Sequence, residues 1–266
     1  MMNNPQPSAF SLQPLVWLIL LVILTTGLVL AKPTGTVSAV EPTPDSLMAQ
    51  GLQAYQRGSF DQASVAWKQA ADLYGREGKV GEQSQALAQA AQASESLGQV
   101  SQALQQLELA LTLAHQTGDR ARIAAVLESL GRTYLAARKP DAAMQYLTQA
   151  LAMAQGDKNR HLIAAIHNDL GIAHVAQQHD VDALAAFLTS AQEAQAAGDR
   201  PLTVRAYINA ARMALKLKKP DHVRDWLDLA FDDLKHFEPS HDKAMSLIQL
   251  GLGYQQLRTS MPAMNA

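Results

Sequence analysis

The 266-residue sequence contains no cysteine. This absence excludes a disulfide framework, a cysteine-based zinc site, a thiol nucleophile and a lipidated N-terminal cysteine. It does not fix the cellular compartment, because an exported protein can simply carry no thiols. Chemistry and lipid anchoring that depend on a cysteine thiol are therefore excluded for this chain.

Aromatic residues and net charge are also scarce. Phe, Trp and Tyr make up 5% of the chain, and Ala, Gln and Leu dominate it. This composition favours helix over strand, so we expect an all-α fold without a sheet. The formal charge is −2 at pH 7, so the sequence lacks the excess of basic residues that is typical of nucleic-acid-binding proteins. Hydrophobic residues reach 48%, enough for a sizeable core.

The N-terminal region lacks charge where a targeting signal normally has it. Residues 15–31, LVWLILLVILTTGLVLA, carry no charge and reach the short end of what spans a bilayer. The small residues before Lys32 favour a cleaved secretory signal, although no Lys or Arg precedes the apolar run. A retained anchor and a buried core helix stay open. We expect residues 1–31 to be a signal peptide or membrane anchor, which places the rest outside the cytoplasm, either exported (periplasmic or extracellular) or membrane-anchored.

Residues 32–44 read as a flexible linker, since Pro, Thr and Gly without periodicity neither pack nor propagate a helix. Beyond them the chain repeats itself. The stretch AHQTGDR at 114–120 returns as AQAAGDR at 194–200, with a looser copy, AQGDKNR, halfway between. A fixed interval of 40 residues is the mark of a repeat architecture.

Each 40-residue frame holds two apolar-periodic stretches joined by a short polar turn, which predicts stacked helix hairpins. The glycines of one column, Gly78, Gly118 and Gly198, fall where a left-handed residue ends the second helix, and Lys158 is the exception. We expect a solenoid over residues 45–260 and a tail at 261–266. The predicted units are hairpins at 45–80, 81–120, 121–160, 161–200 and 201–240, and a lone helix from about 241 to 257.

Residues inside the frames resemble the tetratricopeptide repeat (TPR) family. The alternation of small and large residues is clearest in the first frame and returns in the third and fourth. The matching positions are Gly51, Tyr55, Gly58, Phe60, Ala63, Trp67 and Ala70; Leu130, Gly131, Tyr134, Ala143 and Leu147; and Gly171, His174, Ala183 and Phe187, with Ser190 in place of the final Ala. The resemblance implies a right-handed superhelix of antiparallel hairpins. The 40-residue period departs from the family's usual 34.

We expect no enzyme. No HExxH, GxGxxG, P-loop or GxSxG occurs, and the histidines lack a spacing of four on one helix. His174 replaces a core aromatic, so we expect a hydrogen-bonded histidine between helices. The sequence predicts no catalytic residue, no metal site and no cofactor.

In the TPR family the first helix of each hairpin lines a concave groove that grips a peptide or protein partner. The resemblance implies that the groove here is lined by Arg132, Asn168, Ile172, Arg205, Asn209 and Arg212. Arg205 with Asn209 could hold a carboxylate, and ordinary solvated residues are the alternative. Some members of the family bind a C-terminal carboxylate with Lys and Asn at the positions that Met48 and Leu52 occupy here. The resemblance therefore does not imply that function for the first three repeats.

The last helix carries two apolar faces. Leu247, Leu250, Gly251 and Tyr254 should pack on the preceding hairpin. Met245, Ile248 and Leu252 form a second stripe, which either turns into the groove or mediates self-association. We therefore expect a non-enzymatic scaffold that binds a protein or peptide. The alternatives are a scaffold that forms a homo-oligomer through this helix, a short-peptide sensor, and an adaptor for a separate effector enzyme.

Overall fold

The computed structural model describes residues 42–238 and 241–264, and within these ranges it contains eleven α-helices and no strand. This confirms the all-α fold. The helices are α2 (Pro44–Gln56), α3 (Phe60–Arg76), α4 (Val80–Ser96), α5 (Val100–Thr117), α6 (Arg120–Ala136), α7 (Pro140–Gly156), α8 (Arg160–Ala176), α9 (Asp180–Ala197), α10 (Arg200–Lys216), α11 (Val223–Lys235) and α12 (His241–Met264).

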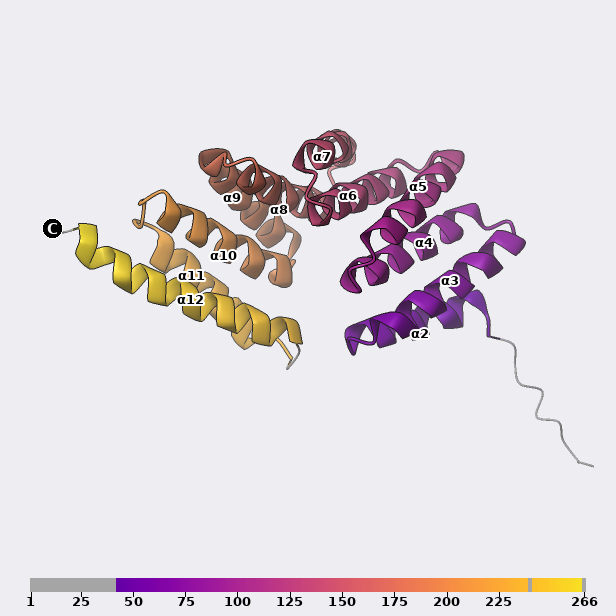
Figure 1. Ribbon diagram of the computed structural model, residues 1–266, viewed down its shortest axis with the longest axis horizontal. Helices are drawn as coiled ribbons and strands as arrows, with labels where there is room; N and C mark the ends of the chain where they lie inside the picture. Colours follow the sequence, from indigo (N-terminus) through magenta and orange to yellow (C-terminus); the bar gives the residue numbers. More distant parts are fainter. Residues whose placement is uncertain (1–41, 239–240, 265–266) are drawn as a thin grey trace, which may run out of the picture. The chain divides into compact units, whose positions relative to one another are not determined.

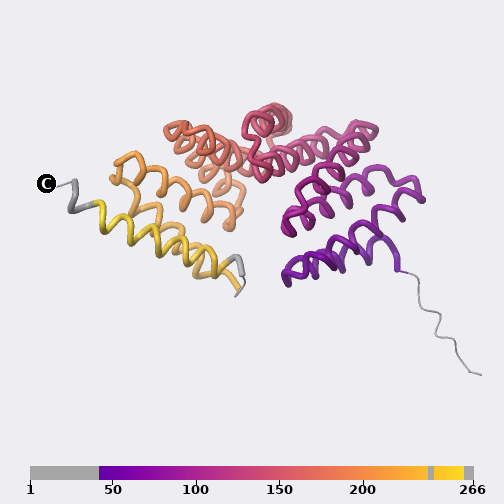
Figure 2. Tube along the Cα trace, viewed as in Figure 1, coloured from indigo at the N-terminus to yellow at the C-terminus, as the bar shows by residue number. Residues whose placement is uncertain are grey.

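Successive helices pack as antiparallel pairs, and the pairs stack in chain order (Figure 1). The hairpins are α2 with α3, α4 with α5, α6 with α7, α8 with α9, and α10 with α11, while α12 packs on both α10 and α11. The first helices also touch one another, α4 on α6, α6 on α8, α8 on α10 and α10 on α12. The trace in Figure 2 follows this TPR-like superhelix from α2 to α12.

The expected signal peptide or anchor, residues 1–31, lies outside the described residues, as does the linker up to residue 41. Among the helices that are described, none combines the length and the apolar character needed to cross a membrane.

A left-handed residue sits in the turns at intervals of 20 residues, half the sequence period. Glycine fills the position at 58, 78, 98, 118 and 198. Where glycine is missing the backbone keeps the same conformation: Lys158 has a φ of 54° and Arg138 a φ of 57°. The turn geometry is therefore set by the helix packing, because a non-glycine residue pays a steric cost there.

The recurring Gly-Asp-Arg motif is the junction between two hairpins. Gly118 ends α5 in the left-handed conformation, with a φ of 66°. Asp119 then caps α6, where its Oδ1 accepts a hydrogen bond from the backbone N–H of Arg122 at 3.1 Å. Asp199 caps α10 in the same way, accepting from Leu202 at 3.0 Å. Three consecutive residues thus stop one helix and start the next.

The core repeats in columns with a spacing of 40 residues. One column of large side chains on the second helices is fully buried: Trp67, Leu107, Leu147, Phe187 and Leu227. It is flanked four residues earlier by Ala63, Ala103, Ala143, Ala183 and Val223, all at 0% exposure. Ser190, which replaces an alanine of the pattern, donates its buried Oγ–H to the carbonyl of Ala164 at 2.8 Å. The hydroxyl is satisfied, so the substitution fits the core.

Glycines on the first helices accept these large side chains. A Cβ at Gly131 would stand 2.5 Å from Cγ of Leu147, and a Cβ at Gly171 would stand 2.5 Å from Cε1 of Phe187. Both distances are shorter than van der Waals contact. The two helices of a hairpin can approach this closely only because the facing residue has no side chain.

The packing of α12 differs from the expectation. Leu250 and Leu257 are buried against the preceding hairpin, but Leu247 is 42% exposed and Gly251 has no neighbour within 4 Å of its Cβ position. Gly253 takes the inward place beside Leu227. The face of α12 that packs on the preceding hairpin is therefore rotated about the helix axis relative to the predicted face. The helix also runs to Met264, into the residues expected to form a tail.

Candidate functional site

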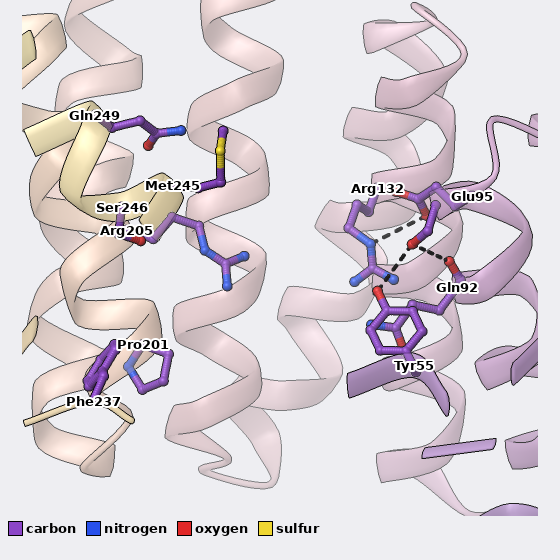
Figure 3. Close-up of a pocket in the computed structure, with 11 residues that line it drawn as sticks. Tyr55, Gln92, Glu95, Arg132, Pro201, Arg205, Phe237, Met245, Ser246 and Gln249 are labelled. Atoms are coloured by element: carbon purple, nitrogen blue, oxygen red, sulfur yellow. Dashed lines mark hydrogen bonds and ion pairs between the residues drawn. The ribbon is translucent and has the colours of Figure 1, made fainter. Parts of the chain in front are cut away.

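The first helices of the hairpins surround a groove of about 470 Å³ between the two ends of the stack. Figure 3 shows its two walls facing each other, with side chains from α2, α4 and α6 on one side and from α10 and α12 on the other. The lining residues are Tyr55, Gln92, Glu95, Ser96, Arg132, Pro201, Arg205, Phe237, Met245, Ser246 and Gln249.

A chain of ion pairs crosses the first wall from α4 to α6. Nε of Arg132 lies 3.6 Å from Oε2 of Glu95, and its Nη1 lies 3.0 Å from Oε1 of Glu128. Thr133 also donates a hydrogen bond to Glu95, at 3.1 Å. Arg132 therefore has two carboxylate partners already, and its charge is neutralised within the wall.

The opposite wall carries a cation with no such partner. Arg205 is exposed on α10, and no described residue forms a hydrogen bond or ion pair with it. Phe237, Met245 and the amide of Gln249 stand on the same side (Figure 3). This wall offers a free guanidinium, apolar surface and an amide that can both donate and accept.

The floor of the groove opens into a smaller hollow of about 270 Å³, which shares Arg132 and Arg205 with the larger one. The buried Asp169 of α8 lines it. Burial raises the pKa of Asp169 well above the ordinary value, the negative charge of Glu128 raises it further, and Arg132 lowers it in part.

Buried amides link α8 to α10 below the groove. Nδ2 of Asn209 donates to Oδ1 of Asn168 at 3.1 Å, and Nη2 of Arg212 donates to Oδ1 of Asn209 at 3.0 Å. Asn168 is 2% exposed and also donates to Asp169 at 3.2 Å. These amides serve the packing of first helices, because their hydrogen-bonding atoms already have partners.

The structure places the predicted groove residues in different environments. Arg132 and Arg205 line the groove, Asn168 lies in its floor, and Asn209 is buried and hydrogen-bonded. Ile172 is exposed but lines neither hollow. Arg212 lines a different hollow, of about 610 Å³, where α10 meets α12.

Sequence reasoning missed several groove residues. On α4 the family resemblance already implies Gln92 as a groove residue. Glu95 and Ser96 lie three and four residues further along on the same face, and this periodicity is the signal that could have located them. Met245 belongs to the second stripe of α12, for which the sequence left the groove and self-association as alternatives, and it lines the groove. Ile248 and Leu252 of that stripe point to neither hollow and are more than half exposed.

Two histidines and an aspartate meet where α8 turns into α9. One ligand atom each from His174, His179 and Asp182 lie within 4.8 Å of one another. Nδ1 of His174 is buried and has no hydrogen-bond partner, so the expectation of a satisfied histidine is wrong. Two imidazoles and a carboxylate suit a divalent transition metal. The arrangement spans a turn, so a search for histidines four apart on one helix misses it.

Comparison with known sequences identifies the repeat. Residues 124–157, which span most of α6 and α7, match the family model described as tetratricopeptide repeat. The chain therefore contains a tetratricopeptide repeat and has a TPR-like fold. No curated protein sequence matches it.

Solved structures share the fold of this TPR protein. A Rap protein complexed with Competence and Sporulation Factor has a TM-score of 0.69 at 16% identity, over 84% of this chain and 64% of that one. The Rap conjugation gene regulator of plasmid pLS20, in complex with the Phr* peptide, has a TM-score of 0.68 at 15% identity, over 96% and 74%.

Aspartyl phosphate phosphatase F from Bacillus subtilis has a TM-score of 0.68 at 14% identity, over 96% of this chain and 61% of that one. The TPR protein thus spans less than two thirds of this phosphatase and of the first Rap protein. At these identities the likeness shows the fold.

The raised pKa of Asp169 predicts that the TPR protein loses stability as the pH rises. The folded state binds the carboxyl proton of Asp169 more tightly than the unfolded chain does, in which aspartates ionise at about pH 4. This contribution is complete below that pH and is lost as the pH rises through the folded-state pKa. Relative to the wild type, we expect Asp169→Asn to have a similar free energy of unfolding at about pH 4 and a higher one at about pH 8. Urea denaturation measures both, and a pH-independent difference would contradict the assignment.

Proposed function

We propose that the groove binds a short peptide or an extended segment of a protein partner. The observation that carries this proposal is the pair of unlike walls, one internally neutralised by Glu95 and Arg132, the other presenting Arg205 without a partner among the described residues. The volume of about 470 Å³ lies within the range of small-ligand pockets, which fits a few peptide residues. The groove walls therefore combine a ligand-sized space with a free cation.

The proposed mode is extended-chain recognition on a rigid surface. The amides of Gln92 and Gln249, one on each wall, can donate to a peptide carbonyl and accept from a peptide N–H. Phe237 and Met245 supply apolar contact, and Arg205 can pair with a carboxylate of the peptide. A Rap conjugation gene regulator of the same fold is described as a complex with the Phr* peptide, which supports this mode.

We infer that the chain itself performs no catalysis. The charged side chains of α4 and α6 at the groove form ion pairs with one another, and the sequence contains no thiol. A fold neighbour is a phosphatase by its name, so the inference rests on these residues and not on the fold.

The groove geometry predicts that reversing the charge of Arg205 weakens the binding of peptides with a free carboxylate. A synthetic library of hexapeptides with free C-terminal carboxylates is incubated with the full chain, and retained peptides are identified by mass spectrometry. We expect Arg205→Glu to retain about tenfold less of the carboxylate peptides, because an attractive contact becomes repulsive. Arg224→Glu, on the second helix α11 and outside both hollows, is the matched control and should behave as the wild type.

Amidated versions of the retained peptides separate carboxylate pairing from general binding. They should bind the wild type more weakly and lose little further affinity in Arg205→Glu. Equal retention by the wild type, Arg205→Glu and Arg224→Glu would count against the groove as the binding site.

We also propose that residues 1–31 direct the solenoid out of the cytoplasm, as a cleaved signal or a retained anchor. The charge-free run at 15–31 supports this proposal. In cell fractions of the native host we expect the protein in the envelope or the medium. Intact mass then decides between a chain that begins at Lys32 and one that keeps residues 1–31. Recovery of the full-length protein in the cytosolic fraction would contradict export.

A further inference from the structure

The turn from α8 to α9 holds two imidazoles and a carboxylate in one place. His174 lies in the last turn of α8, His179 is the N-cap residue of α9, and Asp182 lies in the first turn of α9. One ligand atom from each side chain lies within 4.8 Å of the other two. None of the three residues lines the groove or its smaller hollow, so the cluster is separate from the proposed peptide site.

The backbone of the turn fixes this arrangement. Gln178 has the left-handed conformation, with a φ of 63°, and the backbone N–H of His179 donates to the carbonyl of His174 at 2.9 Å. A hydrogen bond of this kind closes a helix that ends in a left-handed residue. The two residues that carry the imidazoles are therefore joined by one backbone hydrogen bond, and Asp182 follows three residues later on the helix that begins there.

The side chains of the cluster have no other polar partner among the described residues. Nδ1 of His174 is buried without a hydrogen bond, and no described residue forms a hydrogen bond or ion pair with the side chain of His179 or Asp182. The neighbouring Asp180 differs, because Lys216 of α10 donates to its Oδ1 at 2.6 Å. The cluster therefore keeps two imidazoles and one carboxylate available to an ion.

The packing of the repeat does not account for these residues. In the third hairpin the counterpart of His174 is Tyr134, which stacks on Tyr146 with ring centroids 5.2 Å apart. The counterpart of Tyr146 in the fourth hairpin is Ala186, so the ring of His174 has no such stacking partner. Counted in steps of 40 residues, no other hairpin has more than one His, Asp or Glu at the three positions of the cluster. The solenoid is built elsewhere without these side chains, so their meeting is specific to the fourth hairpin.

We propose that His174, His179 and Asp182 bind a Zn²⁺ ion. Imidazole nitrogen and carboxylate oxygen are ordinary zinc ligands, and three protein ligands leave the fourth tetrahedral position to water or to a donor from a partner. Two imidazoles also separate Zn²⁺ from Mg²⁺ and Ca²⁺, which take oxygen ligands.

The side chains reach zinc geometry by a small movement. Ligand atoms about 2.1 Å from a tetrahedral zinc ion stand about 3.4 Å from one another. From within 4.8 Å the three ligand atoms must close by at most about 1.4 Å. His179 and Asp182 are exposed, so rotation about their side-chain bonds supplies this closure without moving the core. The bound ion then links the end of α8 to the start of α9.

Calorimetric titration of the full chain with ZnCl₂, after dialysis against EDTA and then metal-free buffer, tests the site. We expect the wild type to bind one Zn²⁺ ion, and His179→Ala and Asp182→Asn each to bind it at least about tenfold more weakly, because each removes a ligand. His115→Ala, which removes an exposed histidine from α5, is the matched control and should bind as the wild type does. MgCl₂ should give no binding at the same concentrations.

Thermal unfolding measures the link between the helices. With Zn²⁺ at about one hundred times its dissociation constant, the Tm of the wild type should rise by about 5–10 °C, because the ion binds the folded chain in preference to the unfolded one. The Tm of His179→Ala should stay where it is without zinc. Hexapeptide retention by His179→Ala should equal that of the wild type, so the zinc site and the groove can fail separately. A wild type that binds no Zn²⁺ or gains no Tm, or a His179→Ala variant that binds Zn²⁺ as tightly as His115→Ala, would overturn the proposal.

Discussion

The packing of a large side chain against a glycine or an alanine, inside each hairpin, is the contact on which the rest of this structure depends. Leu147 and Phe187 occupy the space that a Cβ at Gly131 or Gly171 would take. The contact fixes how closely the two helices of a hairpin approach. Because it recurs every 40 residues, successive hairpins have the same shape and stack with the first helices side by side. The groove walls are a consequence of that stacking.

The polar residues near the groove divide into those that hold the stack together and those that remain available. Glu95, Arg132 and Glu128 pair across α4 and α6, and Asn168 and Asn209 pair across α8 and α10. Buried polar groups need hydrogen-bond or ion-pair partners, and these side chains find them within the stack. They are therefore not available to a ligand. Arg205 has no partner among the residues described and is the group on which we base recognition.

The sequence period was enough to predict the hairpins, since helix turns and small-large columns are local and repeat visibly. It was not enough to predict burial between hairpins. Asn168 and Asn209 occupy a predicted concave face, yet the neighbouring first helix covers them. Leu247 was expected to pack on the preceding hairpin, but it is 42% exposed, whereas Tyr207, one repeat earlier, clusters with Leu234 of α11 and is buried. The side chains of His174 and Asp182 meet across a turn, which a pattern on one helix cannot reveal.

A double-mutant cycle at Gly131 and Leu147 tests the central packing contact most directly. In the wild-type background Gly131→Ala should cost about 1–3 kcal/mol of unfolding free energy, because its Cβ overlaps Leu147. In the Leu147→Ala background the same change should be neutral or stabilise by up to about 1 kcal/mol, as expected for alanine replacing glycine in a helix. An equal cost of Gly131→Ala in both backgrounds, measured by urea denaturation, would contradict the account.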